Sequence, residues 1–302
     1  METAKDTTHI RRNLLRWYRK NGRSFPWRMP ETDPYVVMVS EVMLQQTQAP
    51  RVAELLPIFL ERFPSVQQLS TASNAAVIMA WKGLGYNNRA LRLRDAARMV
   101  MEEFSGQIPS AMDDLRRLPG IGPYASAAIS TFAFNTRTIV LDVNVRRVYS
   151  RLSSWQPDSA GIAADATLEP FAQSVLPKRN PSEWYHAVMD LGATICMARR
   201  TLCSCCPLQN HCPSSHLEHT PPPLRTSQRS EPMFRGEPRR LWRGRVVQAL
   251  RSIDGRVRHD DLLTMVFGVL NQPEREVVAQ VLTALETDGL ITRDAGYVRL
   301  SD

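Results

Sequence analysis

The cysteines of this chain are confined to one short segment. All five lie between Cys196 and Cys212 of the 302 residues. A secreted disulfide-rich protein would distribute its cysteines along the chain to link distant segments. Clustering of this kind instead predicts a single metal site, which constrains the path of the chain more tightly than any other feature of the sequence.

Four of these cysteines have the spacing of a metal-binding set. The pattern is Cys196-x6-Cys203-x2-Cys206-x5-Cys212, so four thiolates can converge on one centre. Tetrahedral zinc and a 4Fe–4S cluster both use four thiolates, and the spacing alone leaves the two open. Cys205 lies next to a predicted ligand and is expected to point elsewhere.

The charge balance favours a polyanionic partner. The formal net charge is +8 and the isoelectric point is about 9.6, with a mean hydropathy of -0.29. Neutralising phosphates releases counterions, so nucleic acid is a natural partner for such a chain, although a basic soluble protein without one is equally compatible.

The sequence predicts a protein inside the cell. No apolar run approaches the roughly 20 residues needed to span a bilayer. Residues 1–6, Met-Glu-Thr-Ala-Lys-Asp, are charged and lack the apolar core of a secretory signal. We therefore expect a cytoplasmic, nucleoid-associated location. We also expect the protein to be a monomer.

Residues 1–213 predict a succession of helices with short connections. Ile10, Leu14, Trp17 and Tyr18 recur at helical spacing, and Gly22 predicts the end of that helix. Further helices are expected at about 34–47, 50–62, 74–81, 89–104, 111–117 and 123–133. Residues 138–141 alone look extended, and they fit a loop equally well.

The C-terminal part predicts a second, smaller domain. Residues 214–240 are rich in proline and arginine and are expected to form a linker. Apolar positions in 241–250 and 277–285 predict two helices, and residues 290–300 predict two extended pieces around a turn. Helices followed by a hairpin indicate a winged-helix-like domain over 241–302.

The stretch Leu118-Pro119-Gly120-Ile121-Gly122 lies between two predicted helices. Two glycines allow a tight turn, and the next helix begins with unsatisfied N–H groups. Such a turn can offer amides and the positive end of a helix dipole to a phosphate. Many helix–turn–helix junctions contain two glycines, so this signal is weak when it stands alone.

Two acidic residues stand in apolar surroundings. Glu41 lies in a strongly apolar helical stretch, where it is either on a solvated stripe or partly buried as a general acid requires. Asp142 lies in Val140-Leu141-Asp142-Val143. Each acid taken alone is better explained as a cap or surface charge, but as a pair they fit glycoside cleavage: one protonates the leaving group and the other stabilises an oxocarbenium-like centre.

Taken together and in this order, these motifs resemble a known family. Residues 10–213 are similar to the helix–hairpin–helix DNA glycosylases that carry a 4Fe–4S cluster, which include endonuclease III and the MutY branch. The resemblance implies a mainly α, two-lobed glycosylase domain over residues 1–213. It also implies a 4Fe–4S cofactor on Cys196, Cys203, Cys206 and Cys212 and a duplex DNA partner with a mispaired or oxidised base.

Details within the family favour the MutY branch, which excises mispaired adenine. The run Ser40-Glu41-Val42-Met43-Leu44-Gln45-Gln46-Thr47 resembles its signature, so Glu41 inherits the role of proton donor to adenine. Bifunctional relatives place a lysine just after the hairpin. Here that position is Tyr124, which cannot form a Schiff base. The resemblance therefore implies a monofunctional glycosylase.

Other roles carry over position by position. Asp142 corresponds to the residue that stabilises the sugar cation and Asn144 to the asparagine beside it. The hairpin residues Gly120 and Gly122 correspond to positions that bind the DNA backbone. Residues corresponding to wedges around the opposite base are Gln46, Thr47 and Tyr86, and residues corresponding to the lining of the adenine pocket are Trp27, Arg28, Leu44 and Asp190.

The resemblance implies excision of adenine opposite 8-oxoguanine or guanine, with one departure from the branch. Its well-studied members carry a Nudix-like C-terminal domain that recognises 8-oxoguanine. Residues 241–302 are too few for that fold and lack its glutamate-rich motif. The winged-helix-like domain is therefore expected in its place, and the preferred opposite base stays open.

Two alternatives remain. One is a thymine glycosylase acting on G:T mispairs, a sister branch that also has a tyrosine after the hairpin; the run Gln45-Gln46-Thr47 disfavours it. The other is a non-catalytic DNA damage-binding protein in which the cluster has only a structural role. The presence of both Glu41 and Asp142 disfavours this second alternative.

Overall fold

The structure, a computed structural model, describes residues 2–153, 164–216 and 231–302. The chain divides into two compact units. The first comprises residues 1–37, 110–116 and 122–226, and the second comprises residues 38–109, 117–121 and 227–302. No helix among the described residues is long and apolar enough to cross a membrane.

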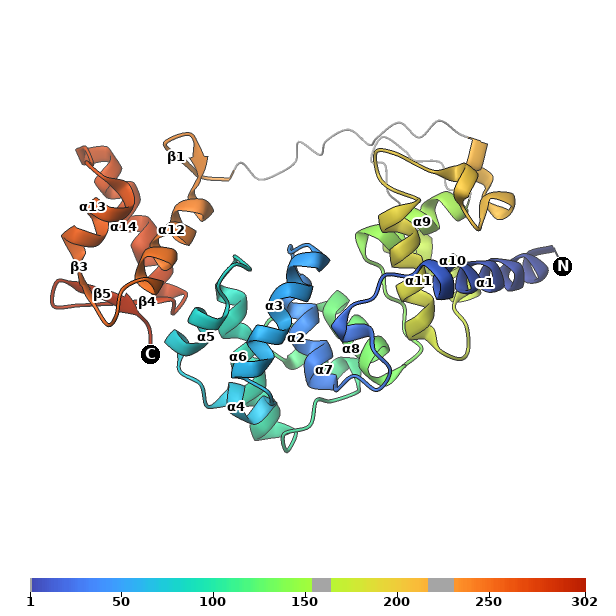
Figure 1. Ribbon diagram of the computed structural model, residues 1–302, viewed down its shortest axis with the longest axis horizontal. Coiled ribbons are helices and arrows are strands. Elements are labelled where there is room, and N and C mark those ends of the chain that lie inside the picture. Colours follow the sequence, from blue (N-terminus) through green and yellow to red (C-terminus); the bar gives the residue numbers. More distant parts are fainter. Residues whose placement is uncertain (1, 154–163, 217–230) are drawn as a thin grey trace. The chain divides into compact units, whose positions relative to one another are not determined.

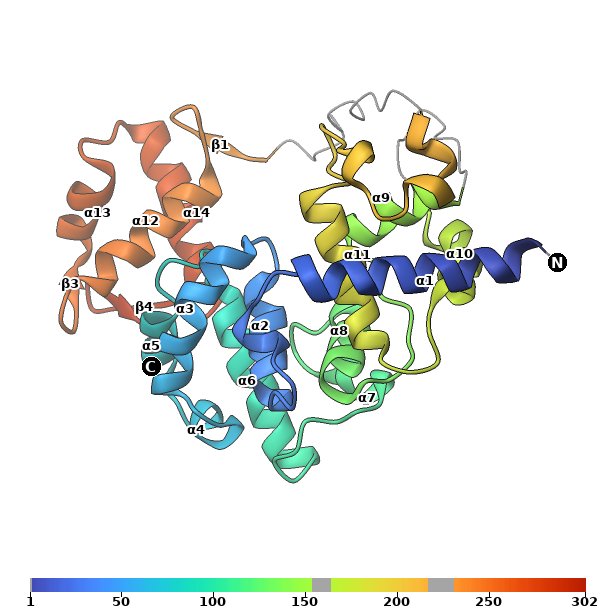
Figure 2. The same cartoon turned by 45° about the vertical axis from the view of Figure 1, so that its right-hand side comes forward.

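The first unit is helical. Its helices are α1 (Glu2–Asn21), α7 (Met112–Arg117, whose last residue belongs to the second unit), α8 (Pro123–Phe134), α9 (Val143–Leu152), α10 (Asp165–Val175) and α11 (Pro181–Thr194). Helix α11 packs against α9 and α1, and α1 also packs against α10 (Figure 2). The 3-10 turns are η1 (Pro26–Arg28), η2 (Cys203–Cys205), η3 (Gln209–His211) and η4 (Pro213–His216).

Large aromatic side chains fill the core of this unit. Tyr149, Trp184 and Tyr185 are fully buried. The indole N–H of Trp184 donates to the Tyr149 hydroxyl over 2.8 Å, so the polar atoms of these two rings satisfy each other. This contact fixes α9 against α11, the two helices that carry several predicted site residues.

The second unit begins with more helices. They are α2 (Pro34–Leu44, whose first turn belongs to the first unit), α3 (Ala49–Arg62), α4 (Val66–Ser70), α5 (Asn74–Ala80) and α6 (Asn88–Glu103). Ser65 and Ser73 cap α4 and α5 through side-chain hydrogen bonds to backbone N–H groups. Both helices pack against α6, whose inner face is buried.

Residues 231–302, which include the 241–302 segment expected to be winged-helix-like, form a module of three helices and a small sheet (Figure 1). Antiparallel strands β3 (Val257–Arg258), β5 (Tyr297–Leu300) and β4 (Ile291–Asp294) form its sheet, in that order. Three helices cover it, namely α12 (Arg239–Arg251), α13 (His259–Phe267) and α14 (Gln272–Thr287). The mainly α fold with this module at its C-terminal end confirms the expected fold class.

The structure departs from the sequence-based expectations mainly within 214–240. Part of that predicted linker, residues 217–230, lies outside the described residues. The rest contains η4 and a two-stranded hairpin of β1 (Met233–Phe234) and β2 (Glu237–Pro238). Arg235 and Gly236 turn the hairpin at positive φ. Phe234 is buried against Trp242, and this burial holds an arginine-rich segment in place.

Candidate functional site

Glu41 is buried in the middle of α2. Its exposed fraction is 5%, and Met38, Val39 and Val42 beside it are also buried. Of the two environments that the sequence allowed, the buried one is correct. A carboxyl in such surroundings suits the delivery of a proton to a ligand better than a solvated surface carboxylate does.

Asp142 is the N-cap of α9. One carboxylate oxygen accepts the Val145 backbone N–H over 2.6 Å, and the other accepts the Asn144 side-chain amide over 2.9 Å. The capping explanation for this residue therefore holds, and it fixes the carboxylate in one orientation. Because Asp142 is only half-buried, the cap does not exclude a ligand.

A single arginine connects Asn144 to the cysteine segment. The guanidinium of Arg147 donates to the Asn144 side-chain oxygen over 2.8 Å, to the Gly192 carbonyl over 2.7 Å and to the Cys196 carbonyl over 2.8 Å. The predicted catalytic pair Asp142–Asn144 is therefore linked by hydrogen bonds to the first predicted metal ligand.

Glycine at position 192 allows α9 and α11 to approach each other. A Cβ atom at Gly192 would lie 2.8 Å from the Cβ of Asn144, closer than real side chains come. Any larger residue would push Asn144 away from its present position. The close helix packing and the placement of Asn144 thus have the same local cause.

Asp190 anchors the segment before α2. It is fully buried and accepts hydrogen bonds from the backbone and guanidinium of Arg23 and from the guanidinium of Arg28, over 2.7 to 3.1 Å. Both arginines also lie over the ring of Phe25, which stacks on Trp27. Trp27, Arg28 and Asp190, three of the residues expected at the adenine pocket, are thus brought together.

Arg28 keeps one unused donor in this cluster. Its Nε is buried without a hydrogen-bond partner among the described residues. Nearby, His186 is buried and stacks on Phe132. Burial, followed by the charge of Arg28, lowers the pKa of His186 well below its usual value, so this histidine is neutral. Sequence reasoning missed His186, because no motif or spacing pattern marks it as a neighbour of this cluster.

Two turns in the second unit carry the predicted wedge residues. Gln46 is exposed with φ +58, just after α2 ends at Leu44. Tyr86 is 45% exposed with φ +43, before α6 begins. Left-handed backbone is strained for a side-chain-bearing residue, so the surrounding structure must hold both turns in place.

Arg89 provides that support. Its buried guanidinium donates to the carbonyls of Val42 and Met43, to the carbonyl of Gln45 and to the Thr47 hydroxyl. It also donates to the carbonyls of Leu84 and Gly85, over 2.9 and 3.2 Å. One side chain therefore holds together the turns that bear Gln46 and Tyr86. Burial lowers the pKa of Arg89 to about 10, which still leaves it charged at neutral pH.

The glycine-rich hairpin joins α7 to α8. Gly120 has φ +81, and its carbonyl accepts the side-chain amide of Gln45 over 3.2 Å. Gly122 is the N-cap of α8, and a Cβ there would meet no atom within 4 Å. Its surroundings therefore leave room for a phosphate to approach the first amides of α8. Tyr124, at the start of α8, is 40% exposed.

The cysteine segment brings four thiols near one another. Cys196, Cys203, Cys206 and Cys212 are partly buried, whereas Cys205 is exposed. Burial above all, together with the other three thiols of this set, raises the pKa of Cys206 to about 12. Cys205 is thus set apart from the other four by its exposure.

Four thiols of this kind are the donor set of either a tetrahedral zinc ion or a 4Fe–4S cluster. Among the described residues, no group of three cysteine, histidine or carboxylate side chains is placed to hold one metal ion. A guanidinium N–H of Arg151 lies 3.1 Å from the Cys196 sulfur and would support a thiolate ligand there.

Comparison with known proteins identifies the class. Residues 39–173 match the HhH-GPD superfamily of base excision DNA repair proteins. A thermostable thymine-DNA glycosylase of solved structure is 26% identical with a TM-score of 0.64, covering 71% of this chain and 99% of its own. Endonuclease III trapped covalently on DNA has a TM-score of 0.58 at 21% identity, over 69% of this chain and 96% of its own, which supports the fold alone. The protein is a helix–hairpin–helix DNA glycosylase.

Sequence relatives narrow the class further. An adenine DNA glycosylase of Mycobacterium tuberculosis is 36% identical over 93% of this chain and 90% of its own length. That of Rattus norvegicus is 40% identical over 68% of this chain but only 42% of its own. The chain belongs to the adenine DNA glycosylase family, the MutY branch that its motifs indicated.

Proposed function

We propose that this protein excises adenine mispaired with 8-oxoguanine or guanine in duplex DNA, as a monofunctional glycosylase of base excision repair. Family membership supports the removal of adenine. The observation that carries the chemistry is the burial of Glu41 among apolar side chains of α2, because base hydrolysis needs a proton donor shielded from water.

The proposed reaction is a hydrolysis in which Glu41 and Asp142 have different roles. Glu41 donates a proton to the purine ring, so the N-glycosidic bond breaks with its electron pair leaving on a neutral adenine. Asp142 offsets the positive charge that develops on the sugar. Water adds to C1′ of the sugar, and the proton that it releases replaces the one Glu41 gave up.

Asp142 is suited to this role by its fixed orientation. The Val145 N–H and the Asn144 amide hold its two oxygens, and Arg147 in turn holds Asn144. A carboxylate already oriented by neighbours needs no rearrangement when the cationic centre forms. Asn144 and Arg147 act as positioning residues in this account.

Flipping the adenine out of the duplex is assigned to the two turns held by Arg89. Gln46, Thr47 and Tyr86 would wedge beside the opposite base, and the hairpin amides near Gly120 and Gly122 would hold the backbone. Extrusion costs a few kcal/mol, less for a mispair. The cluster of Trp27, Arg28 and Asp190, together with Leu44, would receive the base, with the unused Nε of Arg28 as a donor.

The iron–sulfur group is proposed on Cys196, Cys203, Cys206 and Cys212. When bound, it would supply a rigid covalent centre for residues 196–212 rather than redox chemistry. Arg147 donates to the Cys196 carbonyl, so an ordered segment would help to keep Asn144 in position.

A single-turnover assay on three labelled duplexes tests the proposal. The duplexes hold A opposite 8-oxoguanine, A opposite G, or T opposite G, and products are resolved with and without hot alkali. We expect adenine release whose strand break appears only after alkali, because Tyr124 cannot act as an amine nucleophile. Strand breaks without alkali would refute the monofunctional assignment.

The thymine duplex addresses the second candidate function. The structural likeness to a thermostable thymine-DNA glycosylase gives that candidate its support. Release of thymine but not adenine would move the protein to that activity, whereas intact bases in all three duplexes would favour a DNA damage-binding protein.

A further inference from the structure

The winged-helix-like module sorts its charges onto different helices. Residues 231–302 contain 11 arginines and 11 acidic residues, so their formal charge is zero with histidine neutral. Helix α12 carries five arginines and no acid, whereas α14 carries three glutamates and one arginine. The module therefore has one strongly cationic helix in an otherwise anionic setting.

This distribution is the reverse of the usual one. In helix-turn-helix modules the second helix of the motif enters the DNA groove, and here that helix is α14. Its excess of glutamate would repel phosphates. Two of its three glutamates, Glu274 and Glu286, are paired with Arg235 and Arg293 of the module.

Helix α12 is fixed beside the turn that bears Tyr86. Arg251, at its end, donates two hydrogen bonds to the Ile78 carbonyl, over 3.1 and 2.7 Å, and one to the Asn87 side chain, over 2.9 Å. Ile78 and Leu91 of α5 and α6 also belong to the buried core of the module. These contacts all lie within the second unit.

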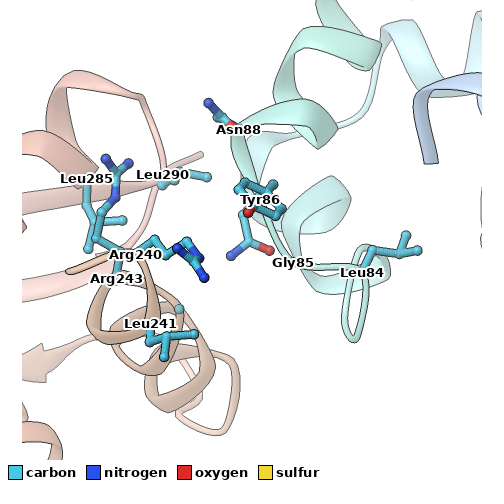
Figure 3. Close-up of a pocket in the computed structure, with 11 residues that line it drawn as sticks. Leu84, Gly85, Tyr86, Asn88, Arg240, Leu241, Arg243, Leu285 and Leu290 are labelled. Atoms are coloured by element: carbon cyan, nitrogen blue, oxygen red, sulfur yellow. The ribbon is translucent and has the colours of Figure 1, made fainter. Parts of the chain in front are cut away.

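A pocket of about 320 Å³ lies between α12 and this turn (Figure 3). Its walls include Tyr86, Asn87 and Asn88 on one side and Arg240, Leu241 and Arg243 on the other. Leu241 is 44% exposed and Tyr86 is 45% exposed. The pocket thus combines exposed apolar side chains with two guanidinium groups, which matches the sugar and base faces of a nucleotide and its phosphates.

The two arginines are available to a phosphate. Arg240 is paired with Glu231 and Arg243 with Asp288, and both ion pairs are partly exposed. Exposed ion pairs contribute little to stability. A DNA phosphate can therefore replace either carboxylate, with release of counterions as a further driving force.

We propose that the module binds duplex DNA through α12, with Arg240 and Arg243 on phosphates of the strand that Tyr86 approaches and Leu241 against its sugars. The assignment of that strand rests on the wedge role proposed for Tyr86. The module would thus extend the DNA interface beside the opposite base. It would do so without α14, the helix whose counterpart in helix-turn-helix modules enters the DNA groove.

Binding of the full-length protein to DNA tests this surface. The probe is a fluorescent duplex with 2′-fluoroadenosine opposite 8-oxoguanine, which resists cleavage. We expect the Arg240→Gln/Arg243→Gln variant to bind roughly tenfold more weakly near 0.1 M salt, and its slope of log K against log salt to shrink by about 1.8. The matched control is Arg258→Gln/Arg275→Gln, the same charge change at exposed arginines outside the pocket.

Equal affinities and salt slopes for the two double variants would overturn the proposal. Hydrogen exchange of the wild-type protein gives a second test that does not depend on variant folding. Peptides of α12 should gain protection on the duplex while those of α14 do not, and the opposite pattern would also overturn it.

These readouts separate the surface from the proposed function. Both measure binding, so they can succeed when adenine is never released. A protein that fails to release adenine but binds through Arg240 and Arg243 would refute the proposed reaction alone. A protein that excises adenine with unchanged affinity in the Arg240→Gln/Arg243→Gln variant would refute the surface alone.

Discussion

At the scale of single residues, buried arginines organise this molecule. Arg89 joins two strained turns, Arg147 joins Asn144 to the cysteine segment, and Arg28 binds Asp190. A guanidinium suits such positions because its planar fork of five donors can satisfy several carbonyls at once.

Replacing Arg89 with lysine should strongly reduce the rate of adenine release. A lysine has three donors on one nitrogen and cannot serve both turns, so Gln46 and Tyr86 should lose their fixed conformations. We expect a single-turnover rate at least about tenfold lower and a loss of about 2 kcal/mol in stability. Arg98→Lys is the control, because that exposed arginine on the same helix makes one hydrogen bond, to the Ser70 carbonyl. Equal losses in both variants would contradict the positioning role.

Replacing Arg147 with lysine tests the support of Asp142. We expect a slower single-turnover rate at saturating enzyme with little change in DNA affinity, because Asn144 would be displaced while the hairpin is untouched. The rate and the binding constant are measured on the same mispaired duplex. A variant that weakens binding and leaves the rate constant intact would show that Arg147 acts on DNA instead.

At the scale of elements, two helical glycines make a matched pair. A Cβ at Gly192 in α11 would collide with Asn144, whereas one at Gly244 in α12 would meet nothing within 4 Å. Gly192→Ala should therefore cost about 1–3 kcal/mol of stability, and Gly244→Ala should add roughly 0.5–1 kcal/mol. Thermal unfolding of both variants measures whether each substitution lowers or raises the stability of the protein. A stabilised Gly192→Ala protein would contradict the helix approach described here.

The cysteine segment offers a second matched pair. Cys206→Ser should abolish the visible absorption and the bound iron of the cluster, and destabilise residues 196–212, while Cys205→Ser should leave both unchanged. The reason is that Cys206 interacts with the other three thiols and Cys205 does not. The iron content of the two purified proteins tests this assignment of ligands. Equal loss of iron from both variants would refute the assigned ligand set.

The sequence predicted elements better than their connections. Helical spacing located α1, α2 and α6, and the last residues located β4 and β5, because these patterns repeat over several turns or alternate clearly. The hairpin at 233–238 escaped prediction because its stability comes from Phe234 packing on Trp242, a contact that composition cannot reveal. Arg89 and Arg147 escaped for the same reason: their roles depend on carbonyls that only the fold brings near.

The site residues were predicted from their resemblance to family motifs, and not from hydropathy or residue spacing. Glu41 was compatible with a solvated stripe or an apolar setting, and only the fold distinguished the two. Asp142 proved to be a helix cap, which is the explanation that the sequence favoured when this residue was considered by itself. Its catalytic role therefore depends on experiment. Asp190 lies far from Trp27 and Arg28 in sequence, and the clustering of the three could be expected only from family resemblance.

At the scale of the whole molecule, the C-terminal module distinguishes the chain from its longer relatives. The match to the Mycobacterium tuberculosis protein spans nearly all of both chains, whereas the match to the Rattus norvegicus protein covers 68% of this chain and 42% of that protein. The module packs on the helices that flank the Tyr86 turn, and its cationic helix lies next to that turn. The proposed surface on α12 therefore places the module beside the turn that is expected to approach the mispair.

The most direct test of the central claim is adenine release by the Glu41→Gln variant. The rate is measured under single-turnover conditions on a duplex with A opposite 8-oxoguanine, beside DNA affinity for the uncleavable analogue. The proton-donor role predicts that release falls by at least about a hundredfold while affinity stays close to that of the unchanged protein. Adenine release at the full rate in this variant would contradict the role of Glu41 and the mechanism built on it.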